Sequence, residues 1–323
     1  MSDGRAGGPP AKPRKPRGPA LNIALFAITL LTTFLAGMLF LYARTWGEAL
    51  SNGLQYMAAL MGILVAHEAG HFVMARRNRV PASLPYFIPL PPNISIYGTM
   101  GAVIVMRGRI RSRDALMEVG AAGPLAGMAV ALPLLIVGLA GIPVGPIPEG
   151  GWMEGQSLLY ILAKRLVVGP IPEGHDIYLD QAPLVWAAWI GMLVTMINLF
   201  PIGQLDGGHI AYALFGRAHQ HISRLFHGGL FVYGISLMAY RVQQAIAAGH
   251  GIGGETFWAR VMPAATWPFL GVLLLVLGVV TKSRNRHPPT DDEHLSPRHR
   301  VIGYLCIALL IMTFMPIVME PVV

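Results

Sequence analysis

The pentapeptide His67-Glu68-Ala69-Gly70-His71 is the part of the sequence best suited to chemistry. Its two histidines are four residues apart, and residues at that spacing share one face of a helix. Both imidazoles could therefore bind one metal ion, and zinc is the ion that this pattern favours. Glu68 lies beside them, where its carboxylate could take a proton from a water molecule at the metal. The pattern is typical of hydrolytic zinc sites.

The pentapeptide lies within an apolar part of an apolar chain. Of the 323 residues, 54% are hydrophobic and only 12% are charged, about half the charged share of an ordinary soluble domain. We therefore expect a protein that crosses the lipid bilayer several times. Ionisable side chains inside a membrane helix are costly and usually functional, which argues against a chance match. The net charge of +8 is spread between apolar segments, so we expect no nucleic-acid partner.

A catalytic zinc site usually has three protein ligands, and Asp206 is the candidate for the third. It lies in residues 198–209, NLFPIGQLDGGH, where a proline and three glycines interrupt an apolar helix. A carboxylate on irregular backbone at membrane depth needs a partner, and a metal ion would serve. His209 could support Asp206 through a hydrogen bond, or it could simply begin a helix near the membrane interface.

Seven apolar segments are long enough, or nearly so, to cross the bilayer. They lie near residues 21–43, 53–75, 115–142, 183–201, 225–240, 264–281 and 301–319. We therefore predict an all-α polytopic membrane protein with about seven transmembrane helices, forming one membrane-embedded domain over residues 21–323. Residues 1–20 are rich in Gly, Pro and basic residues, so we expect a disordered tail there.

Lys and Arg are unevenly divided between the loops. If the N-terminus is cytoplasmic, 19 of the 24 basic residues fall on cytoplasmic segments, as the positive-inside rule requires. We therefore expect a multi-pass protein of a bacterial inner membrane with a cytoplasmic N-terminal tail. In this topology His67 and Asp206 both lie in the cytoplasmic half of the membrane.

Residues 82–106 are apolar, but prolines and glycines recur through them, so they cannot form a regular spanning helix. We expect a membrane-associated β-hairpin or re-entrant loop here, because non-helical backbone at membrane depth must be covered by protein or line a cavity. Residues 94–105 are largely β-branched and partly alternating, as in a strand.

The sequence VGPIPEG occurs twice, at residues 144–150 and 168–174. Turn formation explains its composition. The apolar stretch between the copies carries Lys164 and Arg165, and it could lie as a helix on the outer membrane surface. Cys306 is the single cysteine, so no intramolecular disulfide can form.

Taken together, these motifs resemble the site-2 protease family of intramembrane zinc metalloproteases. The family's H-E-x-x-H motif matches residues 67–71, and its N-x-x-P…L-D-G motif matches residues 198–207. Residues 98–102 are similar to the family's glycine-containing strand segment, and residues 120–127 to its third-span motif. The resemblance covers about residues 53–216, the expected catalytic core, and no inserted PDZ domain is evident.

The resemblance implies one zinc ion per chain, held by His67, His71 and Asp206, with Glu68 as the acid and base. It implies hydrolysis of peptide bonds in or near transmembrane segments of other membrane proteins, in regulated proteolysis. Asn198 would orient the scissile carbonyl, although a residue that ends a helix explains an Asn at this position equally well.

A substrate helix must unwind before its peptide bonds can be cut, and its freed backbone groups then need partners within the membrane. Gly98, Thr99 and Gly101 could provide an exposed strand edge on which the substrate adds as a further strand. The alternative is that this segment only fills a cavity.

Two other functions fit part of the same pattern. A CAAX prenyl endopeptidase would take its third ligand from a downstream Glu, but no Glu occurs between Glu173 and Glu255. A zinc transporter or sensor would bind the metal without hydrolysis, but it has no evident use for Glu68 between the two histidines.

Overall fold

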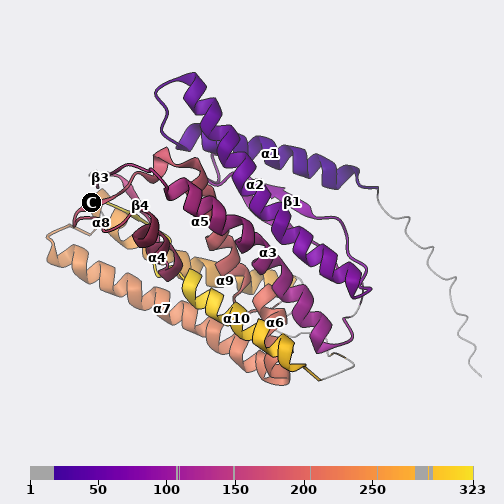
Figure 1. Cartoon of the computed structure of the whole chain (residues 1–323). Helices are drawn as coiled ribbons and strands as arrows, with labels where there is room; N and C mark the ends of the chain where they lie inside the picture. Colours follow the sequence, from indigo (N-terminus) through magenta and orange to yellow (C-terminus); the bar gives the residue numbers. More distant parts are fainter. Residues whose placement is uncertain are drawn as a thin grey trace, which may run out of the picture.

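The computed structural model describes residues 18–106, 108, 110–147, 150–203, 205–252, 254–280, 290 and 294–322. Almost all of the predicted disordered tail lies outside these residues. The described part is mainly helical, and its long helices run roughly alongside one another (Figure 1). The helices are α1 (Ala20–Phe40), α2 (Trp46–Arg77), α3 (Arg113–Leu139), α4 (Leu158–Val167), α5 (Pro183–Asn198), α6 (Asp206–Phe215), α7 (His219–Ala247), α8 (Glu255–Val261), α9 (Thr266–Val280) and α10 (Pro297–Thr313).

Within the described residues, five helical stretches are long and apolar enough to cross a membrane. They are Ala20–Phe40, Trp46–Arg77, Arg113–Leu139, Asp206–Ala247 and Thr256–Val276. The prediction of seven spans is therefore not confirmed. Two predicted spans form the short helices α5 and α10, of 16 and 17 residues, whereas a full crossing takes about 20. Both begin at a proline and end shortly before Pro201 or Pro316, because proline does not continue a helix.

Residues 82–106 contain an antiparallel strand pair rather than a spanning helix. Strands β1 (Tyr86–Pro89) and β2 (Thr99–Val103) pair with Tyr86 opposite Val103 and Phe87 opposite Ala102. The pair lies against α1, where the rings of Phe26 and Phe87 meet edge to face with centroids 5.0 Å apart. An association of this pair with the membrane stays a prediction.

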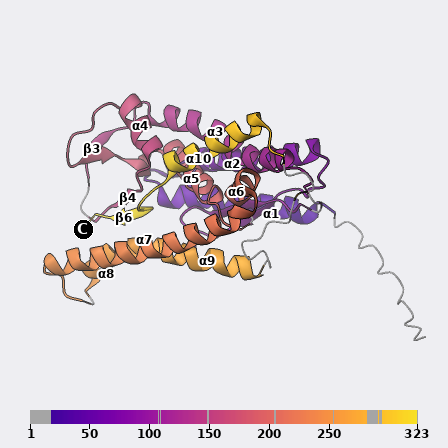
Figure 2. The same ribbon diagram turned by 90° about the horizontal axis from the view of Figure 1, so that it is seen from below.

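The two VGPIPEG copies lie side by side. Strand β3 (Val144–Pro146) belongs to the first copy, and it pairs with β5 (His175–Ile177), which follows the second. Ile147 N–H donates to Gly174 O at 3.0 Å, which joins the copies directly. Strand β4 (Trp152–Glu154) pairs with β6 (Met319–Pro321) nearby. Figure 2 shows α4 at the same end of the molecule as these strands.

Helices α2, α3 and α5 pack together around a core of fully buried side chains that includes Tyr56, Leu135 and Trp189. Small residues let α2 and α3 approach closely. A methyl group added to Gly70 would overlap the carbonyl of Ala122 on α3. This close approach brings the α3 backbone against the histidine face of α2.

Candidate metal centre

Two elements bring three metal-binding side chains together. His67 and His71 project from the same face of α2, and Asp206 is the first residue of α6. The two Nε2 atoms lie 3.2 Å apart, and each lies 3.2 Å from Asp206 Oδ2. The side chains are 4%, 7% and 15% exposed, respectively. This is the three-residue cluster in the described part of the chain whose donor atoms could hold one metal ion.

The spacing of these atoms fits zinc. Bonds of about 2.0–2.1 Å in a tetrahedral site place neighbouring ligand atoms about 3.3–3.4 Å apart. His71 Nδ1–H can donate to Val119 O, 2.7 Å away, which leaves the lone pair of Nε2 pointing at the cluster. A nitrogen lone pair and a carboxylate oxygen this close repel each other unless a proton or a metal ion lies between them. The residues present therefore suit a zinc ion.

Glu68 lies beside this cluster on the next face of α2. The residue is 5% exposed, and its Oε2 has no hydrogen-bond partner among the described residues. A buried carboxylate oxygen without a partner is unusual and calls for an explanation such as an ordered water or a catalytic role. A water molecule at the cluster would provide the missing partner.

The loop between α5 and α6 places Asp206 through its glycines. A side chain at Gly207 would overlap the carbonyl of Leu199, and one at Gly208 would overlap the carbonyl of Gly203. The chain can therefore fold back on itself between Leu199 and the start of α6. This explains why glycines surround the aspartate in the sequence.

Asn198 and His209 flank the cluster differently. Asn198 ends α5, and its Nδ2 lies 3.3 Å from His67 Nε2, so the amide reaches the metal-binding atoms. His209 lies in the first turn of α6 and is 8% exposed. Its Cβ is 3.1 Å from where a methyl group on Gly120 would lie, so His209 packs closely on α3.

The strand residues named from sequence lie apart from this cluster. Thr99 is buried, and its hydroxyl donates to Ile88 O at 2.9 Å and accepts from Gly101 N–H at 3.0 Å. Gly98 has φ of +77° and packs on the backbone of Thr32. Gly101 has φ of +94° and open space around it. The hydrogen bonds described for Thr99 and Gly101 stay within the strand pair.

Two features of the site were not predicted from the sequence. One is the carbonyl of Val119, a backbone atom that no motif could reveal. The other is an apolar crevice of about 290 Å³ between α1, α2 and β1, whose α2 wall is formed by Val65, Ala69 and Phe72. Val65 lies three residues before Glu68, and Ala69 and Phe72 lie one and four residues after it. The crevice therefore lies on the face of α2 next to the face that carries Glu68.

A buried cluster of two histidines and one carboxylate, with a glutamate beside it, lies within apolar helices of spanning length. This combination is typical of membrane proteins with a hydrolytic metal site. The comparison with protein families agrees with this class. The model of Peptidase family M50 matches residues 55–240. The chain belongs to this family.

Curated relatives extend the comparison. The chain is 32% identical over 194 residues to "Probable zinc metalloprotease EGY2, chloroplastic" of Arabidopsis thaliana, which covers 59% of this chain and 34% of the relative. It is 33% identical over 165 residues to "Probable zinc metalloprotease EGY1, chloroplastic" of the same plant. This match covers 49% of this chain and 29% of the relative. The chain thus spans about a third of the length of these relatives. No solved structure matches the chain.

Proposed function

We propose that this chain is an intramembrane zinc metalloprotease that hydrolyses peptide bonds in or near the transmembrane segments of other membrane proteins. The observation that carries this proposal is the set of three donor atoms, mutually 3.2 Å apart, with the unpartnered Glu68 oxygen beside them. Membership of Peptidase family M50 and the names of the plant relatives support it.

Each side chain then has a role. One zinc ion, held by His67, His71 and Asp206, would polarise the substrate carbonyl and make a nearby water more acidic. Glu68 would take the proton from the attacking water and pass it to the leaving amine. Asn198 would donate its amide N–H to the scissile carbonyl. Its present neighbour, His67 Nε2, would use its lone pair for the metal, which frees the amide for substrate.

The free edge of β2 suits a substrate in extended form. In the described residues β2 pairs with β1 on one side only. Met100 and Val103 are 59% and 50% exposed, and no atom outside its chain neighbours lies within 4 Å of a methyl group added to Gly101. An unwound substrate segment could pair along this edge, which would satisfy its backbone groups within the membrane.

The distribution of charge supports a cytoplasmic N-terminus. Helix α2 ends at Arg76 and Arg77, about 8–9 Å of helix beyond His71. Basic residues at a helix end favour the cytoplasmic face. We place the protein in a bacterial inner membrane, where cleavage in the cytoplasmic half would release a cytoplasmic fragment for regulated proteolysis.

The test is cleavage in liposomes. Purified protein is reconstituted with a single-span model substrate and assayed before and after zinc removal and zinc add-back. We expect cleavage that disappears with the metal and returns with it. Zinc flux without cleavage in the same liposomes would instead identify a transporter and refute the proposal.

A further inference from the structure

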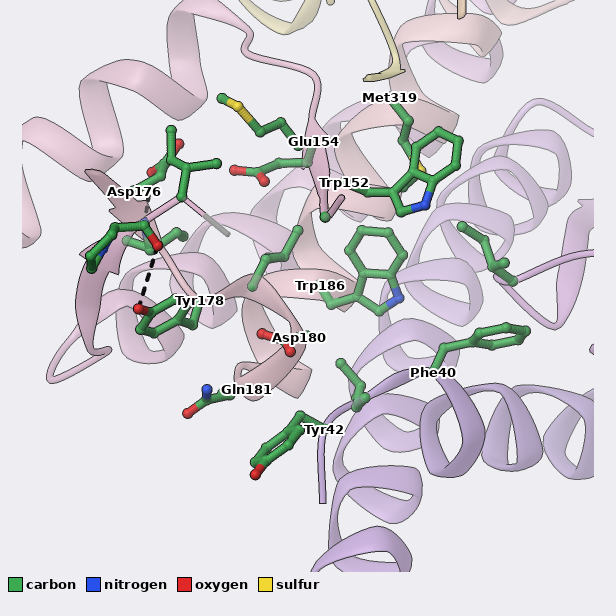
Figure 3. Close-up of a pocket in the computed structure, with 18 residues that line it drawn as sticks. Phe40, Tyr42, Trp152, Glu154, Asp176, Tyr178, Asp180, Gln181, Trp186 and Met319 are labelled. Atoms are coloured by element: carbon green, nitrogen blue, oxygen red, sulfur yellow. Dashed lines mark hydrogen bonds between the residues drawn. The ribbon is translucent and has the colours of Figure 1, made fainter. Parts of the chain in front are cut away.

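A second, larger cavity lies near the start of α2, well before the metal-binding residues on that helix, and Figure 3 shows the residues that line it. Its volume is about 740 Å³, within the range of ligand-binding pockets. The end of α1, the start of α5, strands β3 to β5 and the segment before β2 all contribute to its wall. Tyr42 O accepts from Asn52 near the start of α2, about 22 Å of helix away from His67.

The walls of this outer cavity are aromatic and held in place. The ring of Trp186 stacks on Trp189 with centroids 5.2 Å apart and planes 1° apart. Trp189 in turn donates its indole N–H to Gly155 O at 2.9 Å. Trp186 can therefore offer only its other ring face to the cavity. Figure 3 shows Phe40 and Tyr42 on further sides of the same space.

The charged groups that line the outer cavity are all acidic. They are Glu154, Asp176 and Asp180, and no Lys or Arg is among the described lining residues. Lys164 lies behind the wall, 2.8 Å from Asp176 Oδ1 and 3.6 Å from Glu154 Oε1. Only Glu154 and Asp176 lie against this ammonium group, so with Asp180 the three carboxylates leave a formal charge of −2 when all are ionised. Carboxylates and aromatic faces together favour a positively charged group attached to an apolar body.

Strand β2 runs from the outer cavity toward the level of the metal centre, along the side of α2. Ile96 lines the cavity, and Tyr97 O accepts from Tyr56 on α2 at 2.9 Å. Beyond Tyr97 the chain enters β2 and reaches Val103, at most about 20 Å away, because Gly98 and Gly101 depart from extended backbone. The same interval on α2, from Tyr56 to Glu68, is about 18 Å. Ala102 at the far end of β2 pairs with Phe87, which lines the crevice beside Val65 and Ala69, so the strand reaches the level of Glu68.

We propose that the outer cavity binds the juxtamembrane flank of the substrate polypeptide, through an aromatic or aliphatic side chain followed by Lys or Arg. This inference rests on the proposed function. The flank would enter the cavity where Ile96 lies, and the next six or so extended residues would follow β2 to the metal centre. That continuity favours a peptide over a lipid headgroup carrying an ammonium group, which would have no reason to meet β2.

The test uses a single-span model substrate whose flank, on the side away from the metal centre, reads Leu-Trp-Lys, Leu-Trp-Glu or Ser-Gly-Ser. Each version is assayed with the wild type, with Asp180→Lys and with Glu173→Lys. Asp180 and Glu173 are both exposed acids, but only Asp180 lines the cavity. Both variants therefore change the net charge by the same amount, but only one of them does so in the cavity.

For the wild type we expect the Lys flank to lower KM about three- to tenfold relative to Ser-Gly-Ser, with little change in kcat. The reason is that the flank would contact the cavity equally in the bound substrate and in the transition state. Asp180→Lys should reverse the preference toward the Glu flank, and Glu173→Lys should leave it unchanged. Equal KM for all flanks, or a KM that follows only the phosphatidylethanolamine content of the liposomes, would overturn the proposal.

A binding measurement separates this inference from the proposed function. A photo-reactive group on the substrate flank should crosslink to cavity residues in Glu68→Gln protein, and Asp180→Lys should weaken that crosslink for the Lys flank. Should the wild type cleave none of the substrates, the proteolytic function fails while crosslinking still tests the cavity. Cleavage without any flank crosslink refutes the cavity proposal alone.

Discussion

Gly123 of α3 lies directly against the imidazole of His71, so closely that a methyl group added to Gly123 would overlap Nε2. The backbone of α3 is therefore one wall of the metal centre. The same segment supplies Val119 O, which accepts from His71 Nδ1. One helix thus both orients this histidine and limits the space around its metal-binding nitrogen.

Gly123→Ala should therefore displace His71 and weaken zinc binding about 10- to 100-fold, in the range of changes to groups that support a metal ligand. Zinc content measured against a chelator series tests this. Gly228→Ala is the control, because open space surrounds that glycine on α7. Unchanged zinc affinity in Gly123→Ala would mean that His71 does not bind the metal in this orientation.

Glu68→Gln should keep zinc but lower kcat about 10²- to 10⁴-fold, because the amide has the same size but cannot accept the proton of water. Metal analysis and cleavage of the model substrate are measured on the same preparation. Glu48→Gln, at an exposed position in the first turn of the same helix, should behave as wild type. Near-normal turnover by Glu68→Gln would remove Glu68 from the mechanism.

Asp206→Ala should lose both zinc and activity, because it removes one of three ligands and leaves two neutral imidazoles. His209→Ala should retain zinc, since His209 packs on α3. The two variants are compared by zinc content after dialysis. If Asp206→Ala holds stoichiometric zinc while His209→Ala does not, the third ligand is His209.

Asn198→Ala should keep zinc and lower kcat about tenfold or more, because it removes a donor directed at the carbonyl oxygen as charge develops on it. Steady-state kinetics separate this effect from a loss of substrate binding. A rise in KM with unchanged kcat would place Asn198 in binding alone. No kinetic change would leave it as the residue that ends α5.

Gly101→Pro should keep zinc and lose cleavage. Proline cannot adopt the φ of +94° found there, and it removes the N–H that donates to Thr99. Gly169→Pro is the matched control, because Gly169 has φ of +93° and donates to Lys164 O outside the strand pair. Full activity in Gly101→Pro and in Thr99→Pro, together with no crosslink between substrate and residues 96–102 in Glu68→Gln protein, would refute the edge-strand model.

Local geometry explains what the sequence could predict. The four-residue spacing of His67 and His71 requires only one turn of helix, and the glycines around Asp206 signal a bend wherever they occur. Hydropathy, in contrast, depends on composition and does not predict where a helix ends. The apolar residues after Asn198 and Thr313 looked like continuing spans, although the helices stop there.

Features built by packing between distant segments were not predicted. The outer cavity combines the end of α1, the start of α5, the segment before β2 and short strands from the two loops that flank α4. Turn formation explains the composition of the repeat, but it does not predict that Ile147 and Gly174 join the two copies. Val119 contributes a backbone carbonyl, for which any residue type would serve.

The proposed metal ligands come from positions 135 residues apart in the sequence, measured from His71 to Asp206. An ion bound between them would act as a cross-link that closes this long loop. The chain has a single cysteine and cannot make such a link from its own side chains. Closing a loop of this length lowers the conformational entropy of the unfolded chain, which is worth about 4–5 kcal/mol of stability on the scale used for disulfides. Zinc would then stabilise the fold of this protein as well as take part in its reaction, and its loss would loosen α6 from α2.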